Sequence, residues 1–98
     1  MDFKDGLISG KKEIVIKHQD KDVIFTANEV SYFTFQQLAI DADKENKVFI
    51  AALVAESITA PDGTKFTYDE VMKLKRAVAR PFIAAVAEVN NVGEQSKN

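Results

Sequence analysis

Two short runs of β-branched and aromatic residues occupy the N-terminal third of the chain. They cover residues 13–18 (EIVIKH) and 22–26 (DVIFT), and three polar residues separate them. Runs of this composition are typical of β-strands, and the short polar link predicts a β-hairpin over residues 13–26. Because an isolated hairpin is only marginally stable in water, it must pack on helices or pair with another strand.

Beyond the hairpin, the apolar residues recur at helical spacing. Thr26 or Asn28 is a suitable N-cap for a first helix, which we expect over residues 28–41. The charged run DADKENK at residues 41–47 is either a loop or an exposed turn of a longer helix, and we favour the loop. Residues 47–57 are mostly apolar and rich in alanine, which predicts a second helix at the centre of the core.

A tight turn and a helix start follow the second helix. The PDG sequence at residues 61–63 combines a fixed φ, a side chain that bonds its own backbone and a glycine that permits positive φ. Thr67 and Glu70 have the spacing of a capping box, in which each side chain accepts from the other residue's backbone N–H. These signals predict a chain reversal and then a third helix over residues 68–79.

Pro81 interrupts this helical pattern. A proline inside a helix removes one hydrogen bond and disfavours helical geometry at the preceding residue, here Arg80. We therefore expect a break near Arg80 and a fourth helix over residues 81–91, with a single kinked helix as the alternative. The fold class predicted for residues 13–92 is α+β: one small domain with an N-terminal hairpin and four helices, between a loose lead-in (1–12) and a disordered tail (93–98).

Seven aromatic and aliphatic residues are candidate partner-binding residues. The three on the first helix fall within four positions, so they cannot all point to one face; either both faces are buried, which we favour, or one aromatic is exposed to a partner. The fourth helix is apolar almost all round, so it is centrally buried or half of an interface, and we favour the interface. The seven residues are Tyr32, Phe33, Phe35, Phe82, Ile83, Val86 and Val89.

Charge adds one further candidate surface. The chain has a net charge of −2, which disfavours non-specific attraction to nucleic acid or to anionic lipid. A local basic cluster nevertheless occurs on the third predicted helix, where it is a solvated face or, in the functional reading, an electrostatic docking patch for an acidic partner. The cluster consists of Lys73, Lys75, Arg76 and Arg80.

The sequence offers little material for catalysis. His18 is the single histidine and the chain has no cysteine, so a His-based triad or a thiolate metal site has no partners here. Acidic residues alternate within residues 41–45, but the glycine and the closing carboxylate of a calcium loop are missing. The four glycines are isolated, so no phosphate-binding loop is expected. We expect no enzyme activity, no metal and no cofactor.

The C-terminal half, from about residue 48 to residue 92, resembles that of bacteriophage tail assembly chaperones. The resemblance consists of an apolar helix, an Asp-Gly turn, Phe-Thr before a helix with acidic residues at its start, and an apolar helix ending in Val-Asn-Asn. It implies a protein that binds the long tape measure protein and helps tail tube subunits to polymerise around it. A longer product made by ribosomal frameshifting would also fit this resemblance.

The start of the chain does not look like a signal for export. Residues 1–12 have acidic residues where a signal peptide is basic and no sustained apolar core, so we do not expect export. Together with the resemblance, this implies a protein that acts in the host cytoplasm. Excess apolar surface predicts a homo-oligomer.

Two other functions compete with that of a tail assembly chaperone. One is a small structural phage subunit at the head–tail junction or in the tail. The other is a helix-turn-helix regulator, although its recognition helix, residues 82–90, lacks the polar residues that read bases.

Overall fold

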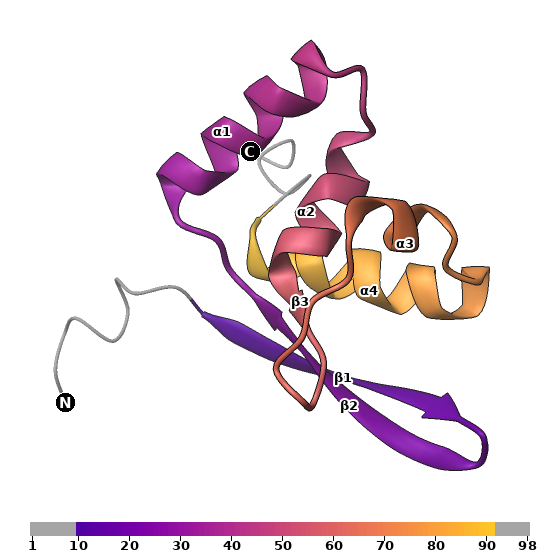
Figure 1. Cartoon of the computed structure of the whole chain (residues 1–98). Coiled ribbons are helices and arrows are strands. Elements are labelled where there is room, and N and C mark those ends of the chain that lie inside the picture. Colours follow the sequence, from indigo (N-terminus) through magenta and orange to yellow (C-terminus); the bar gives the residue numbers. More distant parts are fainter. Residues whose placement is uncertain (1–9, 92–98) are drawn as a thin grey trace, which may run out of the picture.

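The computed structural model describes residues 10–91 and confirms an α+β fold in which a hairpin precedes four helices (Figure 1). It adds a short third strand between the second and third helices. In chain order the elements are β1 (Lys11–His18), β2 (Lys21–Asn28), α1 (Tyr32–Lys44), α2 (Phe49–Ser57), β3 (Ile58–Thr59), α3 (Tyr68–Met72) and α4 (Arg76–Val89).

The hairpin is longer than predicted and closes through a two-residue turn. Pairing runs from Lys11 opposite Asn28 to His18 opposite Lys21. Gln19 and Asp20 both have positive φ, 52° and 63°, which is the backbone that a type I′ turn requires because it matches the strand twist.

The third strand gives the hairpin the partner that its marginal stability demands. Ile58 and Thr59 pair antiparallel with Ala27 and Thr26, so the strand order is β1-β2-β3. The Asn28 side chain strengthens this junction, because its Nδ2 donates to Ser57 O (2.9 Å) and to Thr59 Oγ1 (3.1 Å).

The core lies between the inner face of the hairpin and helices α2 and α4. Helix α4 contacts both β1 and β2, while α2 contacts α1, α3 and α4 and so occupies the centre of the molecule (Figure 1). The prediction that the second helix is the central core element is therefore confirmed. The buried core residues are Ile14, Ala27, Leu53, Val54, Ile58, Phe82, Ala85 and Val86.

The predicted helix break at Arg80-Pro81 is wrong, because Pro81 lies inside α4. Val78 and Val89 pack against the core and Phe82 and Val86 are buried in it, so one apolar stripe runs past the proline. Burial of this stripe outweighs the roughly 3 kcal/mol that an interior proline costs. The break occurs instead over residues 73–75, between α3 and α4.

The first helix also differs from its prediction at both ends. Its N-cap is Ser31, whose side chain accepts from Thr34 N, and neither Thr26 nor Asn28 caps it, since both belong to β2. At the other end, the helix continues to Lys44, so the first four residues of the charged run at 41–47 form the last turn of the helix, in which Ala42 is buried, and the loop begins only after Lys44.

The predicted turn and the capping box are both confirmed. Gly63 has φ of 90°, and its N–H donates to Ala60 O at 2.9 Å. Glu70 N donates to Thr67 Oγ1 (3.2 Å), while Thr67 N donates to Glu70 Oε1 (2.9 Å).

The expected lead-in and tail fall mostly outside the described residues. Of the lead-in, only positions 10–12 are described, and Lys11 and Lys12 already belong to β1. The whole tail, residues 93–98, lies beyond the described range. Within residues 10–91, none of the helices has the length and apolar character needed to cross a membrane.

Candidate functional site

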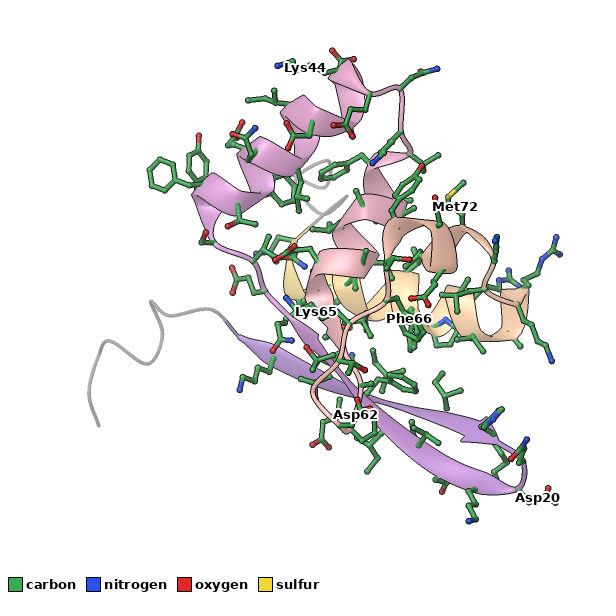
Figure 2. The ribbon with its side chains drawn as sticks, in the orientation of Figure 1. Asp20, Lys44, Asp62, Lys65, Phe66 and Met72 are labelled. Atoms are coloured by element: carbon green, nitrogen blue, oxygen red, sulfur yellow. The ribbon has the colours of Figure 1, made fainter. Side chains whose placement is uncertain are left out.

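An apolar groove lies between the first half of α2, the short helix α3 and the first half of α4. It encloses about 210 Å³. Three of its side chains are markedly exposed: Val48 (47%), Met72 (52%) and Ile83 (39%). Figure 2 shows Met72 projecting away from α3. The lining residues are Val48, Ile50, Ala51, Val54, Val71, Met72, Leu74, Ala79 and Ile83.

Local structure explains why these side chains meet. The capping box starts α3 at Tyr68, and the chain then turns at residues 73–75, so that α3 and α4 both pack against α2. Ala79 and Ile83 are four residues apart on α4 and therefore share one helical face. The groove thus exists because the third and fourth helices are separated at Met72, which is where the sequence pattern predicts a continuous helix.

The basic cluster borders this groove. Lys73 and Lys75 lie in the turn between α3 and α4, and all four basic side chains are exposed. Arg76 and Arg80 lie at i and i+4 on α4, and helical spacing places them on the same face as Ile83. Among residues 10–91, none of the four makes an ion pair with a described carboxylate. The groove therefore combines an apolar floor with unpaired positive charge at one end.

A second hollow, of about 360 Å³, lies on the α1 side of α2 and has a different character. Four of its charged groups form two ion pairs: Lys47 Nζ lies 2.9 Å from Glu45 Oε1, and Lys65 Nζ lies 3.5 Å from Glu56 Oε2. The carboxylate of Asp41 accepts instead from Gln37 Nε2 at 2.9 Å. The hydrogen bond and charge of Glu45 raise the pKa of Lys47. Tyr68 Oη accepts from Val48 N at 2.8 Å. Satisfied charges offer less to a ligand, so this hollow is the weaker candidate site.

The aromatic residues of α1 separate into an exposed pair and a buried residue. Tyr32 and Phe33 are 68% and 80% exposed, and their rings contact each other edge to face at 5.4 Å. Phe35 instead packs against Phe49 of α2 at 5.2 Å. The expectation that this helix buries both faces is wrong, because Ala42 is its one buried residue. The exposed pair is a surface separate from the groove, which no residue of α1 lines.

The expected interface on α4 is mostly core. Phe82 and Val86 are fully buried, so they are not available to a partner, and Val89 is partly buried against the core. The Phe82 ring packs on Phe25 (5.0 Å) and Phe66 (5.8 Å). Among the four candidates on this helix, Ile83 is the one that is exposed. The structure therefore does not bring the seven candidate residues together.

Several groove residues were missed as site residues. Val48, Met72 and Leu74 were read as core or as part of one helical stripe, since a sequence does not distinguish a buried apolar position from one that lines a groove. Met72, an exposed flexible side chain beside a basic cluster, is the signal that could have indicated the groove.

The polar candidates discounted from sequence show no assembled site in the described part of the chain. His18 is exposed at the end of β1. Across residues 10–91, no group of three or more His, Cys, Asp or Glu side chains is placed to hold a metal ion. The helix-turn-helix link expected at Arg80-Pro81 does not exist, because both residues lie within α4.

The Val-Asn-Asn end of α4 has a clear structural role. Asn90 Oδ1 accepts from Val30 N at 2.8 Å, and Asn90 Nδ2 donates to Val86 O at 3.0 Å and to the buried Ser57 Oγ at 3.4 Å. This side chain therefore joins the β2–α1 link to the ends of α2 and α4. The Val-Asn-Asn segment that contributes to the family resemblance thus contains Asn90, whose role in this structure is to hold three elements together.

Comparison with known proteins gives one partial match. No family model and no solved structure was found to match the chain. The UDP-N-acetylmuramoylalanine--D-glutamate ligase of Caldicellulosiruptor bescii is 37% identical to it over 84 residues, or 78% of this chain. The chain spans 18% of that ligase, so the similarity is to a small part of a much longer protein.

Proposed function

We propose that this chain is a non-enzymatic tail assembly chaperone of a bacteriophage, acting in the host cytoplasm. Its client is a long helical protein, the tape measure protein, which it keeps soluble until tail tube subunits assemble around it. The sequence resemblance suggests this role, and the apolar groove between α2, α3 and α4 is the observation that supports it.

The groove suits the apolar stripe of an amphipathic helix. A helix that docks in a groove presents residues at i, i+3, i+4 and i+7, and it buries them against a mainly apolar surface. Val48, Met72 and Ile83 are exposed in the free chain and supply that surface. Met72 adds adaptability, because an unbranched thioether side chain packs against varied partners.

Charge narrows the client further. Lys73, Lys75, Arg76 and Arg80 border the groove and make no ion pair with a described carboxylate. A helix with Asp or Glu beside its apolar stripe would complement them, and such complementarity mainly increases specificity and the association rate. The preferred client segment is therefore acidic as well as amphipathic.

Weak binding by each copy is sufficient for this role. Several copies along one long client would hold it collectively, because each additional contact forms at a high effective concentration. Individual copies would then leave as tube subunits cover the same surface. No chemical step is needed.

Two other functions make different experimental predictions from a chaperone. A small structural subunit of the head–tail junction or the tail would be retained in the finished particle, whereas a chaperone would be absent from it. A DNA-binding protein would use the basic cluster on phosphates, and its affinity would fall steeply with salt as counterions are released. The partial match to a ligase favours no second function, since it covers 18% of that protein.

Co-expression with candidate long helical proteins tests the proposal. The wild-type chain should keep its client soluble, and Ile83→Glu should lose this ability because it places a charge in the groove. Ile40→Glu is the matched control, since Ile40 is also half exposed but lies on α1, outside the groove. Circular dichroism should show both variants folded.

A double reversal, Arg76→Glu with Arg80→Glu, tests the charge preference. It should weaken client binding more at low salt than at high salt, because salt screens exposed charges.

Two outcomes would count against these proposals. Equal loss of client solubilisation in the Ile40→Glu and Ile83→Glu variants would contradict the groove as the site. Salt-sensitive duplex DNA binding that the double reversal abolishes would contradict the chaperone function itself.

A further inference from the structure

Within residues 10–91, which the structure describes, strand β1 has a free edge. In the order β1-β2-β3, strand β1 pairs on one side only and is eight residues long. Long exposed edges are templates for pairing with another strand, and proteins usually shorten, bulge or cover them. An edge of this length that no described residue covers therefore needs an explanation.

Hydrogen-bond alternation identifies which backbone groups are free. The two-residue turn makes His18 and Lys21 a hydrogen-bonded pair, and Gly10 O accepts from Glu29 N at 2.8 Å. Even-numbered residues of β1 therefore bond to β2. The odd-numbered residues, of which Glu13, Val15 and Lys17 are the central three, direct their N–H and C=O groups outward from the sheet edge.

Side chains at the same positions leave apolar surface uncovered. Val15 and Ile24 are directly opposite each other on the outer face of the hairpin, and they are 58% and 46% exposed. Glu13 and Lys17 flank Val15 on that face at equal distances along the strand. Around Val15, the strand therefore has an isoleucine on each side at one residue's distance, and at two residues' distance a negative charge on one side and a positive charge on the other.

We propose that β1 pairs antiparallel with β1 of a second copy of this chain, with Val15 opposite Val15. In this register Glu13 of each copy is opposite Lys17 of the other, and Ile14 is opposite Ile16. The outward backbone groups of Glu13, Val15 and Lys17 also meet in hydrogen-bonded pairs.

The neighbouring registers that preserve backbone pairing are worse. A shift of two in one direction places Lys11 opposite Lys17, and like charges directly opposite each other are destabilising. A shift of two in the other direction places Glu13 opposite Gln19 and Lys17 opposite Val15, so both ion pairs are lost. Charge complementarity therefore selects one alignment and one occupant, a second copy.

The pairing joins two three-stranded sheets into one six-stranded sheet. Val15 and Ile24 of both copies form a continuous apolar stripe across the outer face, and one Glu13–Lys17 ion pair lies on each side of the central Val15–Val15 pair. This dimer does not depend on the chaperone proposal. If that proposal holds as well, one dimer presents two grooves to one client.

Crosslinking tests the register directly, because the chain has no native cysteine. Val15→Cys should form a disulfide-linked dimer under mild oxidation, since Cα atoms in a hydrogen-bonded pair are about 5.5 Å apart, which suits a disulfide. Glu13→Cys is the matched control, because its two copies would lie about 14 Å apart along the strands. Crosslinking of Val15→Cys no greater than that of Glu13→Cys would overturn the proposal.

Reversing side-chain charges provides a second test, in which sedimentation equilibrium at micromolar to submillimolar concentrations measures the dimer Kd. Glu13→Lys creates two symmetric Lys–Lys pairs and should raise the dimer Kd about tenfold. Lys17 Nζ lies 3.9 Å from Oδ1 of Asp22, its partner across the hairpin. Adding Lys17→Glu together with Asp22→Lys keeps opposite charges across the hairpin and should restore dimerisation, whereas Asp43→Lys, an exposed reversal on α1, should leave the Kd unchanged.

Thermal melting of each variant separates dissociation from unfolding. Glu13 faces the uncharged Thr26 in its own hairpin, so Glu13→Lys alone should keep the fold. A wild-type chain that stays monomeric throughout, or a triple variant (Glu13→Lys, Lys17→Glu, Asp22→Lys) as dissociated as Glu13→Lys, would overturn the proposal. Client solubilisation is measured separately, so failure here leaves the groove proposal intact.

Discussion

Helices α1 and α4 carry aromatic and aliphatic residues in similar abundance, but the structure uses them in opposite ways. Helix α4 buries Phe82, Ala85 and Val86 between the hairpin and α2. Helix α1 contacts α2 alone among the principal element contacts, and its first two aromatics lie in solvent. Apolar content by itself therefore does not distinguish core from surface; the number of neighbouring elements does.

The largest expected effect concerns the aromatic cluster under α4. Phe82→Ala removes a fully buried ring that packs on Phe25 and Phe66, so the free energy of unfolding should fall by about 3–5 kcal/mol. In a domain of this size, such a loss leaves little stability. Urea denaturation followed by circular dichroism measures it. A loss below about 1 kcal/mol would mean that α4 is not the core helix.

Pro81→Ala tests why α4 continues through a proline. The variant regains a backbone N–H that can donate to Ala77 O, so the free energy of unfolding should rise by about 1–3 kcal/mol. The same denaturation experiment measures this gain. Destabilisation instead would show that packing of the half-buried proline ring outweighs the missing hydrogen bond.

Thr67→Ala should lower the free energy of unfolding by about 1 kcal/mol, the usual cost of losing an N-cap. Helix α3 has five residues, none of them buried, so its capping box is its principal local support. Thr67→Ser retains the hydroxyl and serves as the control. An unchanged denaturation midpoint in Thr67→Ala would indicate that packing of Val71 and Leu74 alone holds α3.

Phe33→Ala provides the counterpart to Phe82→Ala on the exposed helix. Because the Phe33 ring is mostly in solvent, its removal should change the free energy of unfolding by less than about 0.5 kcal/mol. The comparison between the two helices fails if both phenylalanine variants lose stability equally. A normal fold with reduced client solubilisation would instead assign the α1 aromatics to binding.

The smallest effect is a pH dependence at the turn before α3. Asp62 Oδ1 accepts from Thr64 Oγ1 (2.7 Å) and Thr64 N (3.0 Å), and these bonds lower the pKa of the Asp62 carboxyl. Its stabilising contribution is present above the unfolded-state pKa, about 3.9, and is lost as the pH falls through the lower folded value. NMR titration of the Thr64 amide should follow this change, and Asp62→Asn should abolish it.

Local signals predicted much of the fold correctly. The hairpin, the turn at residues 61–63 and the capping box at Thr67 each depend on a few adjacent residues, so their chemistry is visible in the sequence. The boundary between α3 and α4 was missed because Val71, Leu74 and Val78 have the spacing of one continuous helix. No glycine or proline marks residues 73–75, where the chain turns.

The candidate site was less predictable than the fold. The basic cluster was recognised from sequence, but its position beside an apolar groove depends on how α3 and α4 pack against α2. Three residues expected on an interface, Phe82, Val86 and Val89, are instead in or against the core. Ser31, rather than Thr26 or Asn28, caps α1 because β2 extends to Asn28 and includes both of these residues.

By itself, the sequence determined the α+β class, the hairpin and the turn chemistry, since these follow from neighbouring residues. Only the tertiary structure decided that α4 passes through Pro81, that Tyr32 and Phe33 stay exposed and that a groove opens beside the basic cluster. The physical reason is that burial is shared among elements distant in sequence. Its free energy can override a local preference of a few kcal/mol, such as that of proline.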